Sequence, residues 1–147
     1  MDLIQYCRDH TIAQILELPD VQERVALYRD HAARAKEQIL QCATQIGNLV
    51  VLDLRDEDLI FATNRFTLYA MYPACNISIH VLWGLKRQNT AFAIGKSIVN
   101  RSANTDVGEL CLKYGGGGHH AAGTCQVELA ATDRVLGELI AAITAAG

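Results

Sequence analysis

The stretch Gly115-Gly116-Gly117-Gly118-His119-His120, which continues into Ala121-Ala122-Gly123, is the most informative part of this chain. Glycine has no Cβ and reaches positive φ, so consecutive glycines let backbone N–H groups converge. Such a concavity of amides binds anions, and a histidine at its rim adds a donor that can become cationic. We therefore predict that Gly115, Gly116, Gly117, Gly118 and His119 form a phosphate- or nucleotide-binding site.

A flexible linker is the alternative explanation of the glycine run. Glycine-rich linkers usually contain Ser or Pro and have polar flanks. Here the flanking positions on both sides are apolar: Leu110, Leu112, Tyr114, Cys125 and Val127. These flanks favour a run that lies inside a folded domain.

Working outward from the glycines, the segment Asn100-Arg101-Ser102 precedes a short helix predicted from Thr105 to Tyr114. A guanidinium supplies bidentate donors and a serine supplies a hydroxyl donor, a mixture that suits phosphate. We therefore add Arg101 and Ser102 to the predicted site. For Arg101, and more so for Lys96, an ordinary surface charge remains the alternative.

The distribution of charge supports a small anionic ligand. The net charge of the chain is −3, which argues against a general nucleic-acid coat. Residues 84–127 nevertheless contain five basic and two acidic residues, so the segment that holds the glycines is locally positive. This balance favours a phosphorylated nucleotide or a short single-stranded oligonucleotide over long duplex DNA.

The clearest periodicity predicts a long N-terminal helix from Asp20 to Ile46, with Gly47 as its stop. Its length would be roughly 40 Å, more than a domain of this size needs. The helix would pack on its own domain, connect two domains, or form a dimer seam, and the sequence leaves these options open. Its apolar stripe comprises Val21, Val25, Tyr28, Ala32, Ala35, Ile39, Cys42 and Ile46.

Strands and helices alternate along the rest of the chain. The alternation Cys75, Ile77, Ile79, Val81, Trp83 predicts a strand with one core face. We expect an α/β fold in which a mixed β-sheet is flanked by helices and preceded by the long connector helix. The predicted strands are 48–54, 75–83, 90–95 and 124–129, and the other predicted helices are 11–18, 65–72, 105–114 and 132–145.

The composition is that of an ordinary globular protein of 147 residues, with 50% hydrophobic and 20% charged residues. We expect no membrane association, because no apolar run approaches the roughly 20 residues of a membrane span. The N-terminal residues lack the pattern of a signal peptide. Five cysteines without a CxxC pair predict reduced thiols and a cytoplasmic location.

Three segments resemble the DHH-associated C-terminal domain of the DHH phosphoesterase family: Asn100-Arg101-Ser102, Val107-Gly108-Glu109-Leu110, and Tyr114 to Gly123 with its GGGGH run and the later pair Ala122-Gly123. The similarity extends loosely over residues 48–145 and points to the oligoribonuclease and exopolyphosphatase-like branch. It implies a two-domain enzyme whose N-terminal domain binds manganese and hydrolyses nanoRNA or phosphorylated nucleotides. It also implies that the glycine run, His119, Arg101 and Ser102 hold the substrate's phosphates.

The chain departs from the family in its metal-binding half. Asp30-His31-Ala32 lies on the long helix and is not an Asp-His-His motif, and the acidic turn with Asp56, Glu57 and Asp58 has no histidine nearby. We expect residues 1–47 to be the tail of the missing catalytic domain plus the connector, and residues 48–147 to be the substrate-binding domain. With no catalytic residue and no cofactor of its own, the chain should bind and not cut.

Three rival interpretations remain. Cys111, His119, His120 and Cys125 are residue types that bind zinc, although their spacing fits no common zinc motif. Cys125 beside a histidine would be a nucleophile, which burial in an apolar strand disfavours. A free-standing nucleotide sensor, or a module that dimerises through the long helix, is the main non-enzymatic alternative.

Overall fold

The computed structural model describes residues 3–147; Met1 and Asp2, the first residues of the predicted connector, lie outside this range. A six-stranded mixed sheet has the order β1-β2-β3-β4-β6-β5. Strands β2 and β3 are parallel and all other neighbours are antiparallel. The strands are β1 Ala43–Ile46, β2 Leu49–Asp53, β3 Ile77–Trp83, β4 Asn89–Lys96, β5 Gly117–His119 and β6 Ala122–Glu128.

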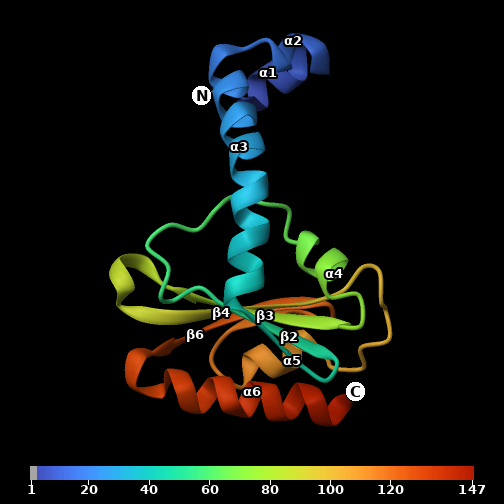
Figure 1. Cartoon of the computed structure of the whole chain (residues 1–147), viewed down its shortest axis with the longest axis vertical. Coiled ribbons are helices and arrows are strands. Elements are labelled where there is room, and N and C mark those ends of the chain that lie inside the picture. Colours follow the sequence, from blue (N-terminus) through green and yellow to red (C-terminus); the bar gives the residue numbers. More distant parts are fainter. Residues whose placement is uncertain (1–2) are drawn as a thin grey trace.

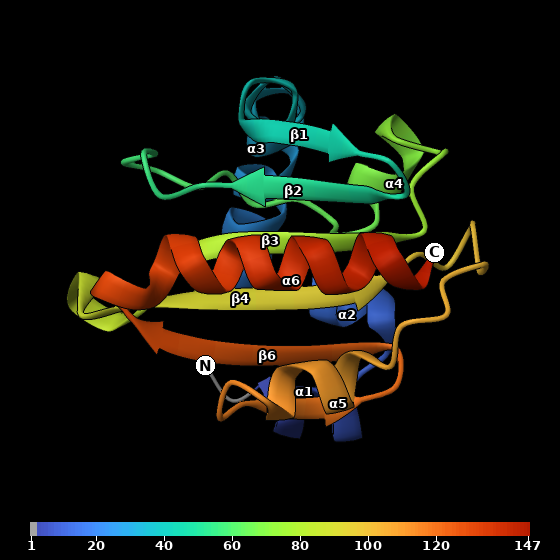
Figure 2. The same ribbon diagram turned by 90° about the horizontal axis from the view of Figure 1, so that it is seen from below.

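Helices lie on both faces of this sheet, which confirms the predicted α/β class (Figures 1 and 2). Helices α5 and α6 cover one face, whereas α4 and the C-terminal end of α3 lie on the other (Figure 1). The helices are α1 Leu3–Asp9, α2 Ile12–Leu16, α3 Pro19–Cys42, α4 Thr67–Met71, α5 Val107–Leu112 and α6 Thr132–Ala146, with 3-10 turns at η1 Leu85–Arg87 and η2 Leu129–Ala131. None of these described helices combines the length and the apolar character that crossing a membrane requires.

The main core fills the space between the sheet and helices α5 and α6. Strand β3 presents alternate residues to this core, as its sequence pattern predicts, and β4 does the same with Phe92 and Ile94. One stripe of α6 completes it with Val135, Leu139 and Ile143, all essentially inaccessible to solvent. A second, smaller core on the opposite face joins Ile39 of α3 to α4 and to β2. Strand β2 is therefore buried on both faces, which explains its continuous apolar run.

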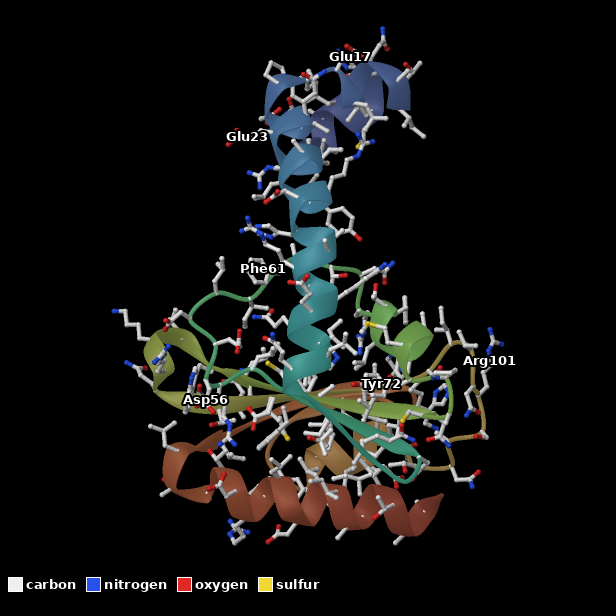
Figure 3. All side chains as sticks on the ribbon, in the orientation of Figure 1. Glu17, Glu23, Asp56, Phe61, Tyr72 and Arg101 are labelled. Carbon is white, nitrogen blue, oxygen red and sulfur yellow. The ribbon has the colours of Figure 1, made fainter. Side chains whose placement is uncertain are left out.

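Helix α3 projects from the sheet as a stalk, with α1 and α2 at its far end (Figure 1). Glu17 and Glu23 mark that far end in Figure 3. Only Ala35, Gln38 and Ile39 are buried, and all three belong to its C-terminal half. Packing on the local domain thus accounts for the last turns of the helix and not for the rest.

The long helix was predicted to continue to Ile46, and this prediction is wrong for its last four residues. The helix ends at Cys42, and Ala43–Ile46 forms β1, which pairs with β2 across a turn at Gly47 with φ of 58°. Pairing with a buried strand outweighs the helical periodicity, because only the sheet satisfies the backbone groups at this edge. The proposed division of the chain between residues 47 and 48 stays a prediction.

The helix caps also differ in detail from the prediction. Asp106, not Thr105, caps α5, since its Oδ1 accepts from the Glu109 amide at 3.0 Å. The buried Thr105 Oγ1 has no hydrogen-bond partner among the described residues. Asn64 Oδ1 accepts a hydrogen bond from the Phe66 amide at 2.9 Å. Helix α4 begins at Thr67, two residues later than predicted. At the other end of the chain, Thr11 caps α2 as predicted.

Candidate anion-binding site beside the glycine strand

The glycine run is an ordered element. The amides of Gly115 and Gly116 donate to carbonyls of Leu112 and Cys111 at 3.1 and 3.0 Å, so they close the end of α5. The next three residues form β5, the edge strand that pairs with β6. The amides of Gly115 and Gly116 are therefore engaged inside the fold, and Gly117 and Gly118 belong to a strand ladder. Contacts to an anion would therefore come from side chains around the run more than from its backbone N–H groups.

Glycine is required here by close backbone contact. A Cβ on Gly116 would lie 2.0 Å from the Thr124 carbonyl oxygen. Gly118 has φ of 155°, and a Cβ there would lie 2.3 Å from the Ala122 carbonyl oxygen. No other residue fits such positions without moving the strands apart. The run thus brings β5 and the end of α5 tightly against β6, which fixes the position of His119.

Two cavities flank His119. The first, about 330 Å³, lies over Gly117 and Gly118, and its walls include the carboxylates of Asp106 and Glu109. The second, about 230 Å³, is lined by Arg65, Lys96 and His119 together with apolar atoms. Within residues 3–147 no acidic side chain lines this second cavity. The charges around the second cavity therefore suit an anion, and those around the first do not. We call the second one the anion cavity.

Arg65 lines the anion cavity, and sequence reasoning did not include it in the predicted site. It precedes α4, and its guanidinium lies against Gly95 of β4, where a Cβ would stand 2.2 Å from Nη2. Gly95 lies inside an otherwise regular strand, and a glycine there often marks the close approach of another group. That signal in the sequence would have pointed to a neighbour of Gly95, although not to Arg65 in particular.

Lys96 follows Gly95 at the end of β4 and lines the anion cavity. Its Nζ donates to the Ala103 carbonyl at 3.1 Å, which ties the strand to the loop of residues 97–106. An ammonium group has three donors, so this bond leaves two for another acceptor.

Arg101 and Ser102 lie on the loop that borders the anion cavity and not in its wall. The exposed Arg101 is at the outer side of the loop (Figure 3), and its Nε donates to the carbonyl of Ile98, a residue that does line the cavity, at 3.1 Å. Ser102 Oγ donates to Asn100 Oδ1 at 2.7 Å and accepts from Asn76 Nδ2 at 3.0 Å. These hydrogen bonds give the loop a defined path beside the anion cavity.

The residues of the proposed zinc site do not form a cluster. Cys111 and Cys125 are buried, whereas His119 and His120 are exposed. Burial and the neighbouring Cys111 raise the pKa of the Cys125 thiol to about 12. A protonated thiol is a poor nucleophile, so the geometry also opposes the Cys–His alternative. No three His, Cys, Asp or Glu side chains anywhere in residues 3–147 are grouped so as to hold a metal ion.

The acidic residues near the end of β2 have structural partners. Asp53 forms a bidentate pair with Arg55, with a shortest distance of 2.7 Å, and this contact raises the pKa of the guanidinium. Glu57 accepts a hydrogen bond from Gln38 at 2.6 Å. His31 Nδ1 accepts from the Ala62 amide at 3.1 Å. These contacts give Asp53, Glu57 and His31 structural roles that require no metal ion. Manganese, which the family resemblance implies, therefore finds no set of ligands in the described part of the chain.

No protein-family model and no curated protein matches the chain. Among solved structures, the chain is similar to PggH from Vibrio cholerae, described as a pGpG-specific phosphodiesterase, with 56% sequence identity and a TM-score of 0.86. The match covers 99% of this chain and 49% of that one, so the chain spans about half of its relative. It is also similar to a DHH domain from a member of a family of ribosomal proteins, with 15% identity and a TM-score of 0.50 over 84% of this chain and 30% of the other. This second likeness concerns the fold alone.

Proposed function

Since the chain belongs to the DHH phosphoesterase family, as its DHH-associated domain, we propose that it binds the phosphates of a phosphorylated dinucleotide or short single-stranded oligonucleotide. The observation that carries this proposal is the anion cavity. Arg65, Lys96 and His119 come from three separate parts of the chain and line one cavity without an opposing carboxylate in the described residues. Charge-assisted hydrogen bonds from such groups to phosphate contribute about 1.5–3 kcal/mol each.

Arg101 and Ser102 would add contacts to the phosphates from the edge of the anion cavity. Arg101 is exposed, and its anchoring to Ile98 through Nε leaves the terminal nitrogens of the guanidinium for a ligand. Because the relative of known structure is described as pGpG-specific, a linear guanine dinucleotide with a terminal phosphate is our preferred ligand. NanoRNA, other phosphorylated nucleotides and polyphosphate are the alternatives within the same chemistry.

Hydrolysis, in this proposal, is carried out by a separate DHH catalytic domain that binds manganese. The relative is about twice as long as the matched region, which leaves room for such a domain. This chain would position the substrate against it. The chain alone should not cleave pGpG when manganese is added, and robust turnover by the purified chain would contradict this division of labour. A cytoplasmic location is part of the proposal and is supported by five free cysteines, three of them buried.

Titration calorimetry with pGpG tests the binding proposal. We expect weak binding that decreases as salt rises from 50 to 200 mM, as contacts to phosphate require. The substitution Arg101→Ala should raise Kd roughly 10-fold or more. Arg87→Ala is the matched control, because Arg87 is an exposed arginine at the opposite end of β4. An equal effect of both substitutions, or no binding of pGpG by the unmodified chain, would contradict the proposal that the anion cavity binds the phosphates.

A second candidate is a free-standing nucleotide sensor or dimerisation module. A groove of about 330 Å³ on the stalk favours dimerisation, because its lining includes the apolar side chains of Leu3, Val21, Val25 and Tyr28. Sedimentation equilibrium checks whether the chain forms a homodimer. If it does, Val25→Glu should give a monomer that still binds pGpG.

A further inference from the structure

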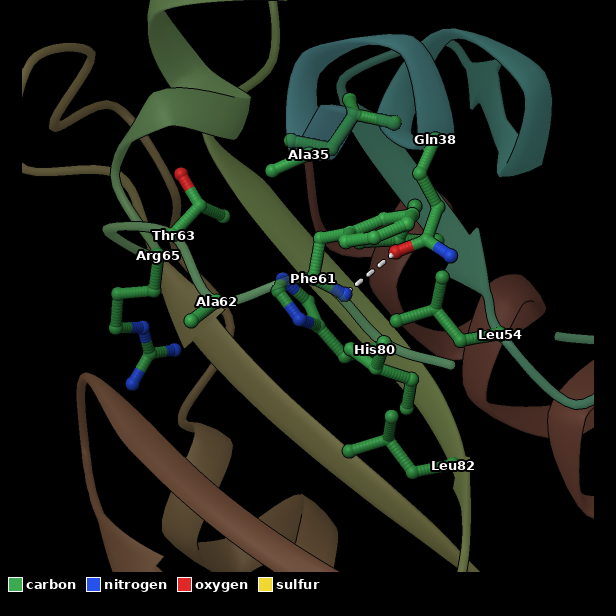
Figure 4. Close-up of a pocket in the computed structure, with 12 residues that line it drawn as sticks. Ala35, Gln38, Leu54, Phe61, Ala62, Thr63, Arg65, His80 and Leu82 are labelled. Atoms are coloured by element: carbon green, nitrogen blue, oxygen red, sulfur yellow. Dashed lines mark hydrogen bonds between the residues drawn. The ribbon is translucent and has the colours of Figure 1, made fainter. Parts of the chain in front are cut away.

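A further cavity lies on the sheet face that carries α3 (Figure 4). It measures about 270 Å³, near the lower end of the range for small-molecule pockets, about 300 Å³. Its wall is largely apolar and comes from α3, from β2 and β3, and from the segment of residues 60–63. The binding of phosphate by the anion cavity does not account for this space, which we call the apolar cavity.

The segment that covers the apolar cavity is held by side chains of α3. Gln38 Oε1 accepts from the Phe61 amide at 3.1 Å (Figure 4), and Gln38 Nε2 donates to the Leu59 carbonyl at 2.8 Å. About two turns earlier on the helix, His31 accepts from the Ala62 amide, and its ring meets the ring of Phe61 edge to face at 5.3 Å. These contacts fix the position of residues 59–62 against the cavity.

His80 of β3 contributes a polar group without a partner to the wall of the apolar cavity. Its Nε2 is shielded from solvent and has no hydrogen-bond partner in the described part of the chain. Burial, and then the charge of Arg65, lower the pKa of His80 to about 4, so the ring is neutral at physiological pH. Buried polar atoms without a partner are uncommon in folded proteins and call for an explanation. A ligand that hydrogen-bonds to the ring would provide one.

Arg65 lines both the apolar cavity and the anion cavity. Its guanidinium lies over Gly95 on the anion side, and in Figure 4 the side chain extends away from Phe61 and Leu54. A ligand with an anionic group at Arg65 and a ring directed toward His80 would therefore contact both spaces. The charge of Arg65 lies close enough to His80 to affect its titration, which fits a short separation between the two parts of such a ligand.

We propose that the apolar cavity receives a nucleobase of the phosphorylated ligand, as a flat heteroaromatic ring that hydrogen-bonds to His80 while Arg65 contacts the adjoining phosphate. This inference rests on the proposed function and extends it from phosphate to base. A neutral imidazole has one donor and one acceptor nitrogen, so it pairs with the polar edge of a base. The ring of Phe61 and the aliphatic side chains would contact the base. An aliphatic ligand would leave His80 unpaired, which disfavours that occupant.

The test is an NMR titration of the full chain that follows the ring nitrogens of His80 and His119 separately. The probes are guanosine 5′-monophosphate, ribose 5-phosphate and guanosine. We expect the monophosphate to shift both histidines, ribose 5-phosphate to shift His119 alone, and guanosine at higher concentration to shift His80 alone.

The outcomes separate the two proposals. If the monophosphate shifts His119 and leaves His80 unchanged, the base cavity is wrong and the phosphate site stands. If guanosine shifts His80 but neither phosphate compound shifts His119, the base cavity stands and the phosphate site is wrong. If no probe moves either ring, both proposals fail.

Two variants add a second readout. Leu82→Phe narrows the apolar cavity, and His80→Gln changes its polar group without a change in charge at neutral pH. Each should raise the Kd of guanosine 5′-monophosphate at least about 5-fold and leave that of ribose 5-phosphate unchanged. His10→Gln, at an exposed histidine beyond the stalk, is the matched control. Should Leu82→Phe fail to fold, His80→Gln decides, and equal losses for both probes would overturn the inference.

Discussion

The guanidinium of Arg65 occupies the space that a side chain on Gly95 would fill, since a Cβ there would lie 2.2 Å from Nη2 and 3.3 Å from Cζ. Gly95 is itself held in place from the neighbouring helix, because Tyr69 Oη donates to its carbonyl at 2.5 Å. The absence of one side chain in β4 thus allows an arginine from a distant segment to reach the anion cavity. Gly95 therefore contacts Arg65 of the anion cavity through its free face and Tyr69 of α4 through its carbonyl.

The substitution Gly95→Ala should weaken anion binding without destabilising the fold. The methyl group would meet only the end of a flexible side chain, so Arg65 would move aside at little cost. We expect the Kd for inorganic phosphate to rise roughly 10-fold, the loss expected for one charged hydrogen bond. Fluorescence-monitored urea unfolding should give a free energy within about 0.5 kcal/mol of the unmodified chain.

A double-mutant cycle connects the two positions. If Gly95→Ala acts by displacing Arg65, then adding it to Arg65→Ala should change the affinity no further. Gly137→Ala is the control glycine, since nothing lies within 4 Å of a Cβ there. Additive losses would show that Gly95 affects binding by another route.

Within the glycine run, neighbouring glycines should respond differently to alanine. Gly116→Ala would place a methyl group 2.0 Å from the Thr124 carbonyl oxygen and 2.6 Å from Cys125 Cα. Backbone atoms of a paired strand cannot move cheaply, so we expect a loss of at least about 2 kcal/mol in the free energy of unfolding. Gly117→Ala, with nothing within 4 Å of its Cβ, should be neutral within about 0.5 kcal/mol. Thermal and urea unfolding of both variants measure the difference, and equal stabilities would contradict the packing described.

The substitution Tyr69→Phe should destabilise the sheet from the side of α4. The Tyr69 hydroxyl is buried between Ser78 Oγ at 2.7 Å and the Gly95 carbonyl. Its removal leaves these polar groups short of a partner, which costs about 1–3 kcal/mol. Tyr72→Phe, in the same helical region but outside this network, is the control. Urea unfolding should rank Tyr69→Phe well below Tyr72→Phe, and similar stabilities would show that the two bonds contribute little.

The sequence predicted the parts of this fold that depend on local pattern. The alternation in β3 identified its core face, and the apolar run of residues 48–54 identified the strand β2. Neither pattern needs knowledge of a partner segment, because burial alone selects the residues. The apolar flanks of the glycine run likewise predicted that it lies inside a folded domain.

What the sequence did not predict depends on contacts between distant segments. Residues 43–46 continue the helical stripe and still form a strand, because β2 offers an edge to pair with. Arg65 looked like the first residue of a helix, and its position over Gly95 arises only when α4 packs on β4. His80 followed the polar side of a strand pattern, which gave no sign of a covered cavity. Tertiary packing decided each of these cases.

The stability of the chain should depend on pH through His80. His80 has a folded pKa of about 4 against an ordinary value of 6.5, because burial and the nearby charge of Arg65 oppose protonation. Between these two values the unfolded chain binds a proton at this site and the folded chain does not. Stability should therefore fall as pH decreases from about 6.5 to about 4, by up to about 3 kcal/mol from this group. Above pH 6.5 the ring is neutral in both states and contributes no slope.

Urea unfolding of the unmodified chain and of His80→Gln at several pH values between 7 and 4.5 isolates this contribution. Carboxylates titrate in the same range, so the informative quantity is the difference between the two profiles. That difference should change steadily below pH 6.5 for His80→Gln. A flat difference would mean that the ring takes up a proton freely in the folded state. Solvent would then reach His80 Nε2, and the unpaired nitrogen that favours a base in the apolar cavity would not exist.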